Sequence, residues 1–191
     1  MNLFRKQPAG RQVIMRMVRK MQNGLFIGES VFVSGLFLMF YVSPYAGLPV
    51  CAIGVILFSI SLGYVIRARL LVRNLERSGE ADNLYREIEL KSCILSPQTN
   101  TIMSANYVIS SGGKTGFEII RNRDVIRFWQ NDYKNKKGYT RDIILITEDG
   151  KKHYIAFYNS KTPIPEAYQE IVDILKKRLG GAVFGKPAGI K

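Results

Sequence analysis

Hydrophobic residues are concentrated in two long runs near the N-terminus of the chain. Leu25 to Val42 is an 18-residue run whose only charged residue is Glu29, and Leu48 to Ile66 is a 19-residue run without any charge. As helices, these runs would be roughly 27–29 Å long, which matches the hydrocarbon thickness of a bilayer. Each run holds eleven Leu, Ile, Val or Phe residues, which together favour insertion by roughly 3–7 kcal/mol. The pattern predicts an integral membrane protein with a two-helix transmembrane hairpin over residues 24–66.

The charges that flank the hairpin predict its orientation. Residues 43–47, between the two runs, are uncharged and include a proline and a glycine, so we expect a tight turn there, with Pro49 at the opening of the second helix. The other ends are flanked by basic residues, namely Arg16, Arg19, Lys20, Arg67, Arg69 and Arg73. Because basic residues stay on the cytosolic side, we expect a multi-pass protein of the cell membrane with both termini in the cytosol.

Two features inside the runs have more than one interpretation. Glu29 could be an intramembrane proton or ion site, or it could lie near the cytosolic interface and pair with Arg67 or Arg69. We favour the second, because two helices alone do not enclose a pathway. Small residues recur every seven positions in each run and predict close helix packing, either within the hairpin or between copies of it; they are Gly28, Gly35, Gly54 and Ser61.

The segments on either side of the hairpin have helical periodicity. Residues 1–23 contain six basic and no acidic residues, and positions 11–22 have the spacing of an amphipathic helix at the inner membrane interface. Residues 67–89 predict a helical juxtamembrane stalk that is interrupted at Ser78-Gly79.

From residue 90 onward the hydrophobic period changes to two. We expect strands over residues 91–95, 101–104, 106–110, 116–121, 125–131, 139–147 and 152–158, with Asp149-Gly150 as a hairpin turn. An apolar stripe predicts a helix over residues 165–179, and residues 181–191 are expected to be a flexible tail. The fold class is therefore α+β, in which a small antiparallel β-barrel or sandwich over residues 90–180 is closed by a C-terminal helix.

A resemblance to a known family rests on the order of three segments. Thr101 to Ser110, Ile119 to Ile126 and Ile143 to Tyr158 around Asp149-Gly150-Lys151 resemble the bacterial PH-like domains, of the YcxB-like type in which membrane hairpins precede the domain. The resemblance covers roughly residues 24–180 and implies a PH-like fold at a membrane more than it implies an activity. The spaced basic residues of an inositol-lipid site are missing, since no Lys or Arg occurs between Cys93 and Asn106.

Composition argues against several function classes. The net charge of +13 lies in large part beside the hairpin, where topology requires it, which argues against a nucleic-acid partner. The two cysteines, Cys51 and Cys93, have no CxxC or His neighbour, and His153 is the only histidine. A His-based metal cluster or a His-centred triad therefore lacks parts, and we predict neither an enzyme nor a bound cofactor. Trp129 is expected to pack in the core.

One basic loop is the candidate site of the β domain. Its residues could contact anionic headgroups or an acidic partner, or they could keep a hairpin tip soluble; they are Lys134, Lys136, Lys137 and Arg141. We expect a membrane-tethered binding or assembly module that presents its domain to a protein partner, a second copy of the chain or anionic lipid. The alternative is a structural or accessory subunit of a membrane transporter or envelope complex that acts through its hairpin.

Overall fold

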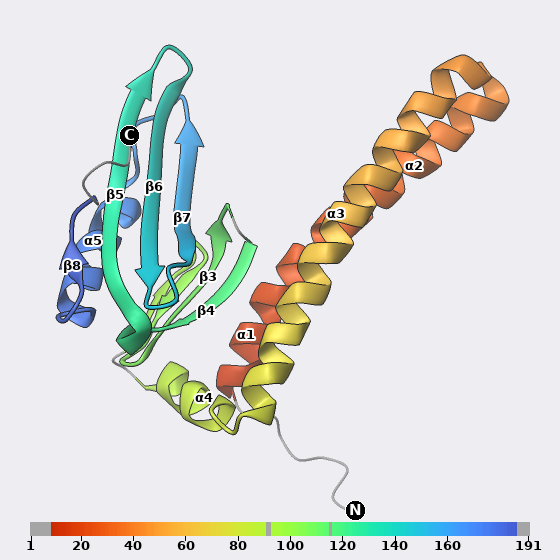
Figure 1. Cartoon of the computed structure of the whole chain (residues 1–191). Helices are drawn as coiled ribbons and strands as arrows, with labels where there is room; N and C mark the ends of the chain where they lie inside the picture. The colour runs from red at the N-terminus through yellow and green to blue at the C-terminus, as the bar shows by residue number, and fades with distance from the viewer. Residues whose placement is uncertain (1–8, 91–92, 115, 187–191) are drawn as a thin grey trace, which may run out of the picture. The chain divides into compact units, whose positions relative to one another are not determined.

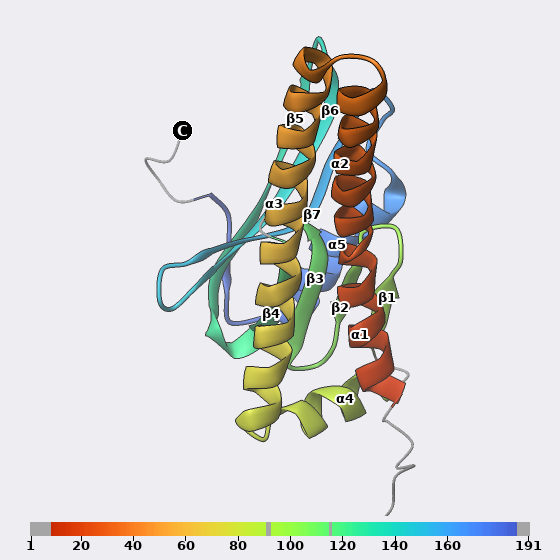
Figure 2. The same ribbon diagram turned by 90° about the vertical axis from the view of Figure 1, so that its right-hand side faces the viewer.

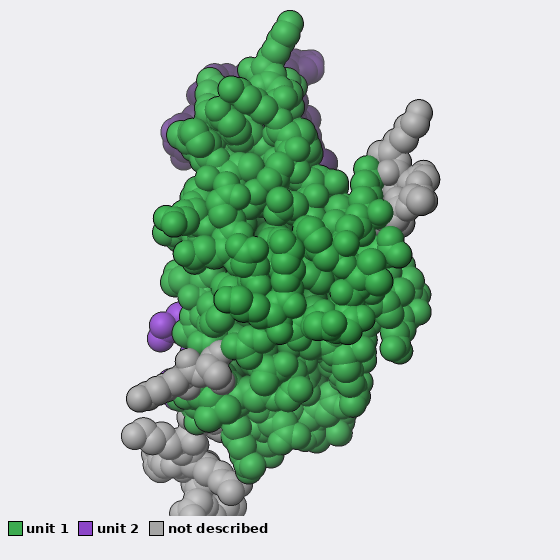
Figure 3. Space-filling view, turned by 90° about the vertical axis from the view of Figure 1, so that its left-hand side faces the viewer, with its two compact units in different colours: residues 1–11, 75–191 green, residues 12–74 purple. Residues whose placement is uncertain are grey.

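The computed structural model describes residues 9–90, 93–114 and 116–186, which form two compact units (Figures 1 and 3). Residues 12–74 make up the helical unit, and residues 9–11 with residues 75–186 make up the β unit. The chain is α+β, with two long apolar helices followed by two sheets. This coarse architecture agrees with the sequence prediction.

Three helices build the hairpin. Helix α1 (Ala9–Met21) is followed after one residue by α2 (Asn23–Tyr41), and α3 (Pro44–Arg77) returns alongside α2 (Figures 1 and 2). The segments 9–41 and 44–77 are both long and apolar enough to cross a membrane. The turn is shorter than predicted, because Pro44 already occupies the first position of α3, where its missing N–H costs little. Pro49 therefore lies inside the helix and not at its opening.

Glycines lie where α2 and α3 approach most closely. A Cβ added to Gly28 would lie 2.6 Å from the backbone nitrogen of Phe58, and one added to Gly35 would lie 2.5 Å from that of Cys51. Gly54 faces Phe32 in the same way at 2.5 Å, and Ser61 lies opposite Gly24. These four small residues therefore face the other helix of the same hairpin, where any larger side chain would force the helices apart.

The outer surface of the hairpin is apolar in its middle and basic at one end. Large side chains such as Phe26, Phe40 and Ile56 are more than half exposed, as expected for a surface that lipid covers. The six flanking basic residues are all exposed, and so is Glu29. On α1, by contrast, the apolar residues Ile14, Met17 and Val18 are buried. Helix α1 runs beside the C-terminal half of α3 (Figures 1 and 2), so packing within the protein accounts for its apolar stripe.

Hydrogen bonds tie the first turn of α1 to the stalk, and all of them lie within the β unit. The Gly10 amide donates to Glu89 Oε1 at 3.0 Å, and the Arg11 guanidinium pairs with Glu76 at 2.9 Å. The Tyr85 hydroxyl donates to the same Glu76 carboxylate at 3.0 Å. Burial and the Glu76 carboxylate raise the pKa of Tyr85 to about 12, so the phenol keeps its proton. These contacts are called the stalk clamp below.

Two four-stranded sheets follow the short helix α4 (Ala81–Glu89). The first is wholly antiparallel in the order β1-β2-β3-β4, and its strands are β1 (Ile94–Ser96), β2 (Thr101–Met103), β3 (Tyr107–Gly113) and β4 (Gly116–Arg121). After the 3-10 turn η1 (Asn122–Asp124), the second sheet has the order β7-β6-β5-β8 and contains β5 (Val125–Asn135), β6 (Gly138–Thr147), β7 (Lys152–Ser160) and β8 (Val183–Phe184). The sheets do not close into a barrel, so the barrel alternative of the prediction is wrong.

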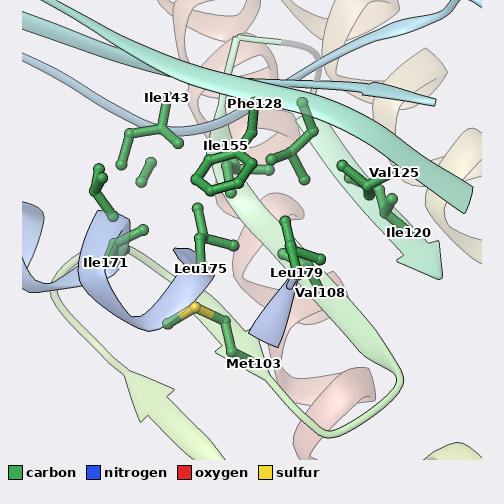
Figure 4. Close-up of a cluster of buried hydrophobic side chains, with 13 residues drawn as sticks. Met103, Val108, Ile120, Val125, Phe128, Ile143, Ile155, Ile171, Leu175 and Leu179 are labelled. Carbon is green, nitrogen blue, oxygen red and sulfur yellow. The ribbon is translucent and has the colours of Figure 1, made fainter. Parts of the chain in front are cut away.

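The core of the β unit lies between the sheets and helix α5 (Glu166–Arg178). Ile171, Leu175 and Leu179 from this helical segment point at Phe128 and Ile143 of the second sheet (Figure 4). Met103 and Val108 of the first sheet complete the same cluster. Each fully buried aliphatic or aromatic side chain contributes about 1.5–3 kcal/mol. Trp129, 3% exposed, is also buried, in agreement with its predicted role in packing.

Two segments differ from the prediction. Strand β5 continues to Asn135, into the expected basic loop, because its polar residues pair in register with those of β6. Val183 and Phe184 form a parallel pair with Arg127 and Phe128 of β5, so this part of the expected flexible tail is ordered as β8. The last residues of that tail lie outside the described residues.

Candidate functional site

Three lysines of the predicted basic loop lie together at the tip of the β5–β6 hairpin. Lys136 and Lys137 form the two-residue turn, and Asn135 Oδ1 accepts the amides of Lys137 and Gly138 at 2.8 and 3.1 Å. Gly138 has φ of +137°, a conformation that favours glycine. Lys134 is exposed beside the turn with its ammonium group 5.0 Å from the centre of the Tyr139 ring. The tip thus presents three ammonium groups to the surroundings.

Arg141, the fourth predicted residue of this surface, does not belong to it. Its side chain is only 2% exposed and pairs with the Asp132 carboxylate. It also donates to the carbonyl of Tyr168 at 2.5 Å and to Gln169 Oε1 at 2.7 Å. Asp132 is its direct neighbour across the hairpin, at a point where α5 covers the sheet face. Arg141 therefore fastens the hairpin to α5, and its buried guanidinium is not presented to an anionic surface.

A cavity of about 540 Å³ lies between α4 and the first sheet. One wall is the exposed face of α4, where a spacing of three or four residues places Glu80, Asn83, Arg86, Glu87 and Leu90 on the same side. The opposite face of α4 is buried through Ala81, Leu84, Tyr85 and Ile88, which fixes how the helix is turned.

The other wall of this cavity is made by the first sheet and η1. Its residues are Asn106, Tyr107, Arg121 and Arg123. Three arginines and two glutamates therefore meet in one cavity, although they come from two separate segments of the chain. The volume lies within the usual range for small-ligand sites. We call this cavity the α4 pocket.

The two carboxylates of the α4 pocket are held by groups of the sheet wall. Glu80 pairs with Arg121 at 2.7 Å, and Glu87 accepts the backbone amide of Asn106 at 3.0 Å and its side-chain amide at 2.5 Å. Burial alone would raise the pKa of Glu87, but hydrogen bonds from Ser104 and Asn106 and the charge of Arg178 together lower it. Both contacts hold α4 at a fixed distance from the sheet.

His153 lies between a carboxylate and a hydroxyl group. Its Nδ1 is 2.5 Å from Oε2 of Glu118, which is 4% exposed, and its Nε2 is 3.1 Å from Oγ1 of Thr147. That hydroxyl is also 2.6 Å from Asp149 Oδ1. The Thr147 hydroxyl therefore lies between the Asp149 carboxylate and the imidazole of His153. The network ties β4, β6 and β7 together.

Neither the His153 network nor the α4 pocket could be predicted from local sequence patterns. The sequence predicts that a His-centred triad lacks parts, yet the fold brings Glu118 of the first sheet to His153 of the second sheet from 35 residues away. Among the described residues, no group of three or more His, Cys, Asp or Glu side chains is placed to hold a metal ion.

The chain matches no protein-family model, no curated protein and no solved structure.

Proposed function

We propose that this chain is a membrane-tethered binding module without enzymatic activity, which presents its β unit at the cytosolic face of the cell membrane to a protein partner or to anionic lipid. The observation that carries the proposal is the combination of an apolar hairpin long enough to span a bilayer with a β unit that has a charged pocket and an exposed basic tip. The hairpin supplies location, and the β unit supplies a surface for recognition.

The resemblance to bacterial PH-like domains supports the same proposal. That resemblance implies consecutive antiparallel strands followed by one C-terminal helix packed on the core, as in this β unit. It also implies a membrane hairpin in front of the domain. The basic residues at both cytosolic ends of the hairpin support the orientation, with only the turn near Ser43 on the outer side.

Cysteine accessibility in intact cells tests this topology. Cys51 and Cys93 are first replaced by serine, and single cysteines are then placed at Ala46 and at Gly180, where a Cβ would meet no other atom. A membrane-impermeant maleimide should label Ala46→Cys directly and Gly180→Cys only after permeabilisation. The reverse pattern would overturn the orientation and with it the cytosolic location of the β unit.

An accessory role in a transporter or envelope complex is the competing proposal. Its support is the apolar outer surface of the hairpin, which a second membrane protein could cover instead of lipid. Purification in mild detergent, followed by mass spectrometry of co-eluting proteins, separates the two. Stoichiometric integral membrane proteins that still co-elute after the β unit is deleted would favour the accessory role, whereas partners lost with that deletion would favour the binding module.

A further inference from the structure

The α4 pocket has more hydrogen-bond donors than its own acceptors can use. Arg86 and Asn83 have no side-chain partner within the described part of the chain, and neither does the hydroxyl of Tyr107. Arg123 pairs only with its neighbour Asp124, at 3.5 Å, and its side chain remains 74% exposed. Arg121 directs one nitrogen at Glu80 and keeps further N–H groups. These donors come from both walls and border one cavity.

Both carboxylates of the α4 pocket already have a partner in the sheet wall. Glu87 is held by Asn106, and Glu80 is held by Arg121. Three guanidinium groups against two carboxylates leave the pocket with an excess of one positive charge before any ligand enters. A ligand that completes this site must therefore bring several oxygen acceptors and negative charge.

We infer that the α4 pocket binds a phosphate group. Guanidinium groups recognise phosphate through paired N–H···O bonds, and an amide and a phenol can satisfy the remaining oxygens. The cavity of about 540 Å³ is much larger than a phosphate ion, so the phosphate is carried by a small organic molecule or by a lipid headgroup. Leu90, 58% exposed at the rim, supplies an apolar contact for the remainder of such a molecule. The inference deepens the proposed function by naming the ligand chemistry of the β unit.

The test uses the full-length protein in a zwitterionic detergent, with two probes. Glycerol 3-phosphate represents a free phosphorylated compound, and dioctanoyl phosphatidic acid represents a lipid headgroup. Binding is measured as the ligand-dependent rise in the thermal unfolding midpoint and by isothermal titration. If both probes bind, the pocket accepts free phosphorylated compounds; if only the lipid binds, the pocket is a headgroup site that needs the apolar rim. Either result supports the inference.

The decisive variant is Arg86→Gln/Arg123→Gln, which removes two charged guanidinium groups without breaking the Glu80–Arg121 pair. Because a hydrogen bond to a charged group typically contributes a factor of ten or more, we expect about a hundred-fold weaker binding. The control Lys161→Gln/Lys177→Gln removes the same charge at two exposed positions outside the pocket and should leave affinity unchanged. Glu80→Gln removes a competing carboxylate and should tighten binding several-fold.

Two results would overturn the inference. One is the absence of binding by either probe in wild-type protein that is folded by its unfolding transition; the other is equal loss of affinity in the pocket variant and the control. Neither result touches the proposed function, because membrane topology and protein partners are measured independently of phosphate. Wrong topology in the accessibility experiment, conversely, would remove the tethered module and leave the phosphate affinity as it was measured.

Discussion

Replacing Arg141 by methionine should destabilise the β unit strongly, although the residue lies outside the α4 pocket. The variant keeps the apolar stem but removes the donors to Asp132, Tyr168 and Gln169. Breaking a buried ion pair costs about 3–5 kcal/mol. The Asp132 side chain is 35% exposed and can regain water, so we expect a loss of about 2–4 kcal/mol. This is a large part of the about 5–15 kcal/mol by which a domain is stable.

The single tryptophan makes this measurement clean in the full-length protein. Trp129 is the only tryptophan of the chain and is buried in β5, so its fluorescence reports unfolding of the β unit and not of the hairpin. With a urea dependence of about 1–3 kcal/mol per molar, the midpoint of Arg141→Met should fall by roughly 1–2 M. The matched variant Arg127→Met, on the same hairpin but without a side-chain partner in the described residues, should change it little. Equal midpoints for Arg141→Met and wild type would refute the fastening role of Arg141.

Three further predictions concern the hairpin, the stalk and the basic tip. Gly35→Leu should lower the thermal midpoint of the full-length protein in detergent, since a Cβ would already lie 2.5 Å from the Cys51 backbone, whereas Gly63→Leu meets nothing within 4 Å; equal midpoints would contradict the packing argument. Because the pKa of Glu87 is lowered in the folded protein, its carboxylate stabilises the fold fully above its ordinary pKa of 4.5, and this stabilisation is lost as the pH falls. In urea titrations, Glu87→Gln should therefore lose less stability than wild type between about pH 5 and pH 3. Replacing the tip lysines Lys134, Lys136 and Lys137 by glutamine should weaken binding of a soluble fragment of residues 79–191 to anionic vesicles by up to roughly 3 kcal/mol at low salt. The charge-matched control changes Lys152, Lys161 and Lys177. If the wild-type fragment binds anionic vesicles as poorly as neutral ones, the tip is a solvated turn.

Local patterns predicted the elements of this fold well where one period or one turn decides them. Strand β4 begins and ends at the predicted residues, and α4 occupies the predicted second piece of the stalk. The turn at Asp149-Gly150 lies between β6 and β7, with Gly150 at φ of +76°, which explains why the dipeptide is such a strong signal. In each case the deciding interactions join residues that are close in sequence.

What could not be predicted depends on contacts between distant segments. The burial of Arg141 is decided by α5, which lies about 27 residues away along the chain, so its charge alone suggested an exposed position. Strand β8 has two residues, too few to show any period, and it exists because β5 offers a free edge. The α4 pocket combines a helix face with two strand ends, and no single window of sequence contains it.

The stalk clamp has a consequence for the order in which the protein is assembled. Gly10 and Arg11 are joined to Glu89 and Glu76, which are 79 and 65 residues further along the chain. A ribosome therefore completes most of both long apolar helices before it adds the residues that close the clamp. In the proposed topology, a chain whose second helix failed to insert would hold Arg11 and Glu76 on opposite sides of the membrane. In such a chain α4 would lack the hydrogen bond that Glu89 accepts from Gly10.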